Sequence, residues 1–210
     1  SAFFVYNGLS DKTRIKPKKD KKEIPKTKNL LKLFLAGEVI YQLALSSSFA
    51  LVITFLVTDK YHSSIVWIAT LFMGLYLSMT LTTIITKKYF EKLNLVKSTI
   101  LGMLTLLSSA VLIIISNNLY MVMAAMILEG IGAGIWVPSK TAFYWKVTPP
   151  HIRENISGHL NGWIGIVKIF GPLFGGWLVS EFSILAPFYF KIAVSLLCII
   201  VYFIVLIKIK

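Results

Sequence analysis

Residues 162–179 read GWIGIVKIFGPLFGGWLV, a run of apolar residues and glycines that contains a single charge, Lys168. As a helix, about 20 apolar residues cross a hydrocarbon core that is ~30 Å thick. Lipid offers no hydrogen-bond partners to the backbone, so a span of this length must be helical. The run therefore predicts a transmembrane helix with a lysine at membrane depth.

Similar blocks surround this run along the 210-residue chain, which is 56% hydrophobic and only 15% charged. An average soluble domain is about 25% charged and 45–50% apolar, so this excess is too large for one soluble core. We predict an all-α integral membrane bundle with six spans, at approximately 30–57, 64–86, 96–115, 119–139, 158–180 and 188–207.

The basic residues lie almost entirely at one end of this bundle. Of the 22 Lys and Arg residues, 19 fall on the side that holds both termini, Lys60 falls on the other side, and Lys168 and Lys191 fall within spans. The positive-inside rule then predicts a multi-pass protein of the cell membrane with cytoplasmic N- and C-termini. The net charge of +13 thus reflects topology, and nucleic acid is not an expected partner.

Residues 1–29 form the expected non-membrane segment, with nine basic residues between positions 7 and 29 and no apolar periodicity. We interpret it as a basic cytoplasmic linker, because such a segment cannot bury enough surface to fold alone. It is either a merely solvated tail or a surface that attracts anionic lipid. Residues 1–6, SAFFVY, are typical of the end of a preceding membrane helix, which would make the chain a fragment.

Groups for catalysis or metal binding are missing from the pattern of this sequence. Cys198 is the one cysteine and lies in the 188–207 span, and His62, His151 and His159 lie in loops or at a helix end. No HExxH or GxSxG motif occurs. The sequence therefore predicts no catalytic residue, no metal site, no cofactor and no enzyme activity.

Polar and ionisable side chains, which are unfavourable at membrane depth, are concentrated in three of the six spans. Residues at i, i+3, i+4 and i+7 share a helix face, which defines one polar stripe in each of the spans 30–57, 119–139 and 158–180. We predict that these stripes line a solute or ion pathway through Glu38, Gln42, Glu129, Trp136, Asn161 and Lys168. Three other interpretations remain: Glu129 and Lys168, which lie at the same depth, form a structural ion pair; Glu38 lies near enough to the cytoplasmic end to be hydrated; and Trp136 is a packing or interfacial residue.

Lys191 and the glycines have simpler explanations. Lys191 closely follows the outer loop, so its ammonium group is expected to reach the membrane interface. Small-xxx-small spacings let helices approach closely, and Pro172 kinks its helix; both features also permit a hinge. We assign this packing or hinge role to Gly130, Gly134, Gly171, Pro172, Gly175 and Gly176.

The stretch LEGIGAGIWVPSKTAFYWKVTPPHIRENISGHLNGWIGIVKIFGPLFGGWLV, residues 128–179, resembles the major facilitator superfamily (MFS) of secondary transporters. The features that match are a glycine-rich helix that ends near Pro138, a loop with two prolines followed by Arg153, and GPLFGG at 171–176. The loop after the second span keeps basic residues but lacks the family's Asp and Gly, and position 126 holds Met where many drug–proton antiporters have Arg. These departures favour the C-terminal half of such a transporter, with an N-terminal half as the alternative.

The resemblance implies a half built of two three-helix inverted repeats that rocks against another six-helix half in alternating access. It implies that the first and fourth helices line the cavity, that the second and fifth face the other half, and that the third and sixth face the lipid bilayer. The cytoplasmic gate would contain Lys87, Lys88 and Arg153. The expected function is proton- or ion-coupled transport of a small-molecule solute; the alternative is a non-transporting receptor or assembly subunit on the same bundle.

Overall fold

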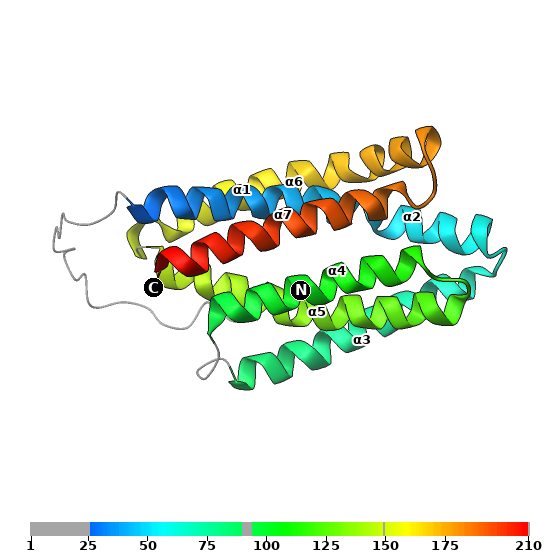
Figure 1. The fold of residues 1–210 in the computed structure, drawn as a ribbon, viewed down its shortest axis with the longest axis horizontal. Helices are drawn as coiled ribbons and strands as arrows, with labels where there is room; N and C mark the ends of the chain where they lie inside the picture. Colours follow the sequence, from blue (N-terminus) through cyan, green and yellow to red (C-terminus); the bar gives the residue numbers. More distant parts are fainter. Residues whose placement is uncertain (1–25, 90–93, 149, 210) are drawn as a thin grey trace, which may run out of the picture.

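The computed structural model describes residues 26–89, 94–148 and 150–209 (Figure 1). Within them six helices are long and apolar enough to cross a membrane, as predicted. The described part is helical between short turns. Its elements are α1 Lys26–Ser48, α2 Ala50–Phe55, the π-helix η1 Leu56–Lys60, α3 Ile65–Tyr89, α4 Leu95–Ile114, α5 Leu119–Val147, α6 Pro150–Glu181 and α7 Ala186–Ile209. Most of the predicted 1–29 linker lies outside the described residues, while Lys26–Asn29 belong to α1.

The first span is interrupted at Phe49, where one continuous helix was expected. The hydroxyls of three consecutive serines donate to carbonyls three or four residues earlier, as Ser46 does to Gln42 (2.6 Å) and Ser48 does to Ala44 (2.9 Å). Such bonds compete with the helical ladder and bend helices. Phe49, with φ −89° and ψ −143°, then leaves the helical region, so the span continues as α2 and η1 in a new direction.

α5 and α6 extend beyond the predicted apolar blocks and nearly meet. Thr148 is extended, as the residue before a proline prefers to be, and α6 begins with Pro150. The Arg153 Nε donates to the Thr148 carbonyl (2.7 Å), and the Tyr144 hydroxyl donates to the Arg153 carbonyl (3.1 Å). As a consequence Lys140, which follows directly after the predicted span 119–139, lies within α5.

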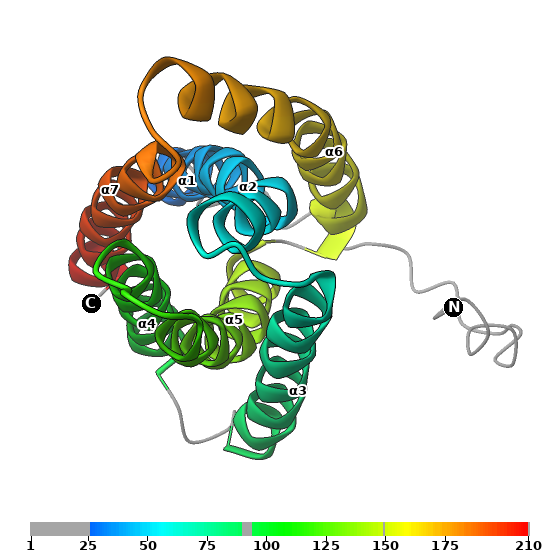
Figure 2. The ribbon, with the colours of Figure 1, turned by 90° about the vertical axis from the view of Figure 1, so that its right-hand side faces the viewer.

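The helices pair in a pattern with internal symmetry. α1 packs against α6 and α7, α5 packs against α3 and α4, and α4 packs against α7. Viewed along the bundle, α6, α1, α7, α4, α5 and α3 follow one another in an arc (Figure 2). Exchanging the first three spans with the last three maps these contacts onto one another, which is the arrangement expected of two three-helix repeats.

Glycines permit the closest of these approaches. A Cβ on Gly134 would lie 2.7 Å from the Thr82 Cβ in α3, and one on Gly130 would overlap Ser78 in the same helix. On the opposite side of the bundle, a Cβ on Gly171 or on Gly175 would overlap Ser46 or the backbone of Ser47. The two glycine pairs thus serve the α3–α5 and α1–α6 contacts, which the repeat symmetry makes equivalent.

The buried apolar side chains form two clusters, one toward each end of the bundle. One contains Phe34, Tyr41, Trp136 and Tyr202, and the other contains Ile53, Leu71, Met126 and Phe188. α3 and α6 contribute little to either cluster, since only 11% of the most apolar part of each is buried. These two helices therefore present long apolar faces that nothing in the described chain covers.

Candidate functional site

A cavity of about 420 Å³ opens among α1, α3, α5 and α6. α1 contributes Tyr41 and Gln42, and Phe49 comes from the break between α1 and α2. α3 contributes Tyr76 and Met79. From the second repeat, α5 contributes Glu129 and Trp136, and α6 contributes Lys168 and Pro172. Four of the six residues predicted for the pathway, Gln42, Glu129, Trp136 and Lys168, line this larger cavity.

The remaining two predicted residues line a second pocket of about 250 Å³, toward the end of the bundle where α5 turns into α6. Glu38 of α1 and Asn161 of α6 border it, together with Lys140 and Tyr144 of α5. Each of the three polar stripes therefore runs from the smaller pocket to the larger cavity.

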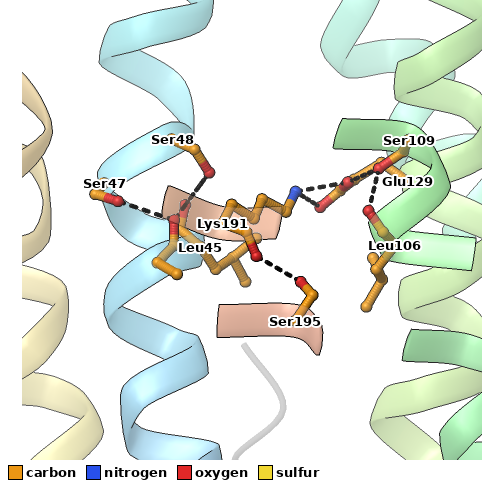
Figure 3. Close-up of polar contacts among 9 residues, drawn as sticks. Leu45, Ser47, Ser48, Leu106, Ser109, Glu129, Lys191 and Ser195 are labelled. Carbon is orange, nitrogen blue, oxygen red and sulfur yellow. Dashed lines mark hydrogen bonds and ion pairs between the residues drawn. The ribbon is translucent and has the colours of Figure 1, made fainter. Parts of the chain in front are cut away.

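Glu129 is held at the wall of the larger cavity by a buried ion pair. The Lys191 ammonium group in α7 donates to both carboxylate oxygens, at 2.6 and 2.7 Å, and the Ser109 hydroxyl in α4 donates to one of them (Figure 3). Lys191 is 2% exposed and Glu129 4%. An isolated charge at this depth is expensive, so mutual pairing is what allows both groups to be there.

This arrangement corrects two expectations from the sequence. Lys191 does not reach the membrane interface, because its side chain points inward from α7 to the Glu129 carboxylate in α5. The partner of Glu129 is accordingly Lys191, and the alternative of a structural Glu129–Lys168 ion pair is wrong.

A second ion pair lies between α1 and α5. The Lys140 ammonium group contacts Glu38, to which the Gln42 amide also donates (3.1 Å). The same ammonium group lies 3.6 Å from the centre of the Trp136 ring, a cation–π contact. Lys140 and Glu129 are 11 residues apart in α5, so the two ion pairs are separated by about 16 Å along the helix.

Lys168 differs from the other charged residues of this region. Its side chain is exposed at the wall of the larger cavity, and within the described ranges no carboxylate or carbonyl pairs with it. Glu129 and Lys168 thus share the cavity, but only the carboxylate is neutralised by the protein.

The sequence profile of the Major Facilitator Superfamily matches residues 33–209, which include all six spans. The chain belongs to this superfamily. Its members are transporters, not enzymes.

Among curated relatives, quinolone resistance protein NorA of Staphylococcus aureus strain MRSA252 is 28% identical over 97 residues. NorA of strain N315 is 27% identical over the same length. The matched part is 46% of this chain and 25% of NorA, so the chain aligns with about a quarter of the relatives' length.

The MFS gate residues predicted from the sequence have different surroundings. Lys87 and Lys88 lie in the last turn of α3, and their side chains are outside the described part of the structure. Arg153 closes the turn between α5 and α6 and lies 5.5 Å from the Trp145 ring. Its contacts are local, within the turn that joins two neighbouring helices.

In the described residues no three His, Cys, Asp or Glu side chains are close enough together to hold a metal ion. The site residues that sequence reasoning missed are the two lysines that neutralise the acids, Lys140 and Lys191, and the hydroxyl of Ser109. The one signal for Lys191 was a charge opposite to that of Glu129, and its position near the outer loop argued against a pairing at the depth of Glu129. That signal could not show that α7 and α5 lie on either side of the same buried space.

Proposed function

We propose that this chain is one six-helix half of a secondary active MFS transporter that moves a small solute by alternating access, coupled to a proton or another ion. The cavity of about 420 Å³ is the observation that carries the proposal. Its volume falls in the range of small-molecule sites, and such sites combine apolar walls with a few placed polar groups. It is walled by helices from both repeats, as a site near the membrane midplane requires.

The second half of the transporter is proposed to cover α3 and α6. Their exposed apolar side chains include Leu77 and Leu81 of α3 and Ile169 and Leu173 of α6. α4 and α7 pack on each other and keep narrower exposed stripes, such as Leu101 and Leu104, which suit lipid. The missing Asp–Gly loop motif supports a C-terminal half, and an N-terminal half is the alternative.

The proposed orientation places the α5–α6 turn and both termini in the cytoplasm of a cell, since nearly all basic residues lie at that end. The structure offers a direct labelling test, because the native cysteine Cys198 is buried and gives little background. Cysteines introduced at the exposed positions His62 and Lys146 lie at opposite ends of the bundle. An impermeant thiol reagent applied to whole cells should label His62→Cys alone; labelling of Lys146→Cys alone would reverse the topology.

Transport is tested by solute uptake into proteoliposomes that contain the full-length protein. Lys168→Ala should abolish uptake while expression and thermal stability stay at wild-type values, because no described group depends on this side chain. Glu129→Gln should also abolish uptake, with a loss of stability from the uncompensated Lys191. Lys97→Ala, an exposed lysine of α4 away from the cavity, is the matched control.

Normal uptake by Lys168→Ala would exclude this side chain from the pathway. A stable, correctly oriented protein that moves no solute from a broad panel would instead favour the alternative, a receptor or assembly subunit on the same bundle.

A further inference from the structure

We propose that the larger cavity selects an organic anion, an aromatic or aliphatic body that carries one carboxylate or a similar acidic group, with Lys168 as its counter-charge. This inference rests on the proposed function and adds the chemical class of the solute. The inference depends on which charged side chains of the cavity already have a partner of opposite charge within the protein.

The carboxylate in the cavity wall is already satisfied. Glu129 receives two charge-assisted hydrogen bonds from Lys191 and a third from Ser109, on a side chain that is 4% exposed. A cationic solute would have to compete with a covalently tethered ammonium group for the same oxygens. Glu129 therefore has little remaining capacity to bind a cationic solute.

The second acid is also paired with a cation. The Oε1 atom of Glu38 contacts Lys140 and accepts a hydrogen bond from Gln42, while its Oε2 atom is buried without a hydrogen-bond partner in the described residues. Glu38 borders the smaller pocket, not the larger cavity. Lys140 is in turn held between this carboxylate and the Trp136 ring. Neither member of this ion pair adds uncompensated charge to the larger cavity.

Lys168 is the charge that remains. It lines the larger cavity from α6, one turn before Pro172, and has no anionic partner among residues 26–89, 94–148 and 150–209. Lysine is a compact point charge on a flexible stem, which suits an anion of variable geometry. When the cavity closes and loses water, this ammonium group becomes costly unless an anion enters with it.

The other side chains of the cavity wall indicate what kind of molecule carries the acidic group. Phe49, Tyr76, Met79 and Trp136 surround the space with aromatic and thioether groups, which bind flat apolar molecules without strict shape demands. An anion held at Lys168 would place its apolar part against these side chains. A small inorganic anion would leave that surface uncovered.

Binding of three matched probes to the purified full-length protein tests the proposal: naphthoate, naphthamide and naphthylmethylammonium. They share one apolar body and differ in charge. Competition against radiolabelled naphthoate measures the affinity of each probe. The assay is run on wild type, Lys168→Gln, Lys168→Arg and the control Lys146→Gln, whose side chain is exposed outside the cavity. Thermal stability of each variant is measured alongside.

In wild type, naphthoate should bind about tenfold or more tightly than naphthamide, as a charge-assisted contact predicts. Lys168→Gln should reduce that ratio to near one, whereas Lys168→Arg and Lys146→Gln should preserve it. Absence of saturable naphthoate binding, tighter binding of the ammonium probe, or an unchanged ratio in Lys168→Gln would each overturn the proposal. Naphthoate binding that depends on Lys168, without flux in proteoliposomes, would refute the proposed transport function and leave the anion site in place. Flux with no preference for the anionic probe would refute the anion site and leave the transport function in place.

Discussion

The ion pair between Glu129 and Lys191 allows a quantitative test of what supports the cavity wall. Lys191→Met keeps the length and helix propensity of the side chain but removes its charge. Glu129 would then remain 4% exposed with the Ser109 hydroxyl as its remaining described donor. Glu129→Gln makes the reverse change and leaves the ammonium group, 2% exposed, without a carboxylate.

Removing one member of a buried pair costs about 3–5 kcal/mol of unfolding free energy, whereas removing both is often nearly neutral. We expect the lower end, about 3 kcal/mol, for each single variant, because Ser109 still binds Glu129 and the cavity lies beside it. The double variant Glu129→Gln/Lys191→Met should recover most of that loss. The measured coupling between the two positions should then exceed about 2 kcal/mol.

Thermal unfolding of the purified protein in detergent, followed by loss of the monodisperse fraction, measures these effects. For a unit of this size about 1 kcal/mol corresponds to ~2–4 °C, so each single variant should melt roughly 6–12 °C below wild type. Lys97→Met, in which the changed side chain is exposed, should melt with wild type. The reasoning fails if Lys191→Met also melts with wild type, or if the double variant is no more stable than the weaker single one.

Three further predictions concern other contacts. Gly134→Ala should cost about 1–3 kcal/mol in the same melting assay, because its Cβ would lie 2.7 Å from the Thr82 Cβ. Gly158→Ala, at an exposed position of α6 with no atom within 4 Å, should be neutral or should stabilise by up to about 1 kcal/mol. Equal melting points would contradict the close α3–α5 approach. Lys140→Gln should lower the melting temperature by leaving Glu38 buried without its cation, and the exchange Glu38→Lys/Lys140→Glu should restore part of the loss; no recovery on exchange would argue against a direct ion pair. Tyr61→Phe should cost about 0.5–1.5 kcal/mol, since the Tyr61 hydroxyl lies 2.9 Å from the Ser116 carbonyl; an unchanged melting temperature would mean that this loop contact does not contribute to stability.

The spans were predictable because lipid leaves the chain few choices. A block of about 20 apolar residues has to be a helix, and its length can be read directly from the sequence. The break at Phe49 was not predictable in this way, because it depends on serine hydroxyls that bond to helix carbonyls, which hydropathy does not report. The ends of α5 and α6 were also missed, since beyond the membrane a helix ends where its backbone conformation changes, at Thr148, and not where apolarity ends.

The position of each polar site residue along its helix was predictable from the sequence, but its contacts with other helices were not. Helical periodicity placed Glu38, Glu129 and Lys168 on polar stripes. In the structure Glu129 and Lys168 line the larger cavity and Glu38 lines the smaller pocket. Which lysine meets which acid depends on how helices far apart in the sequence are arranged around the bundle. By its position along the span, Lys168 matched the depth of Glu129 and Lys191 lay near the outer loop, yet Lys191 is the lysine that reaches Glu129.

The distance in sequence between Glu129 and Lys191 has a consequence for the order in which the protein is made. The two residues are 62 positions apart, and α7 emerges from the ribosome after α5. At ~5–20 residues per second, the carboxylate waits roughly 3–12 s for its ammonium partner. Until α7 is inserted, the nascent chain holds at membrane depth an acid whose burial costs roughly 2.5–3.5 kcal/mol on insertion scales, so α7 completes the charge balance of helices already synthesised.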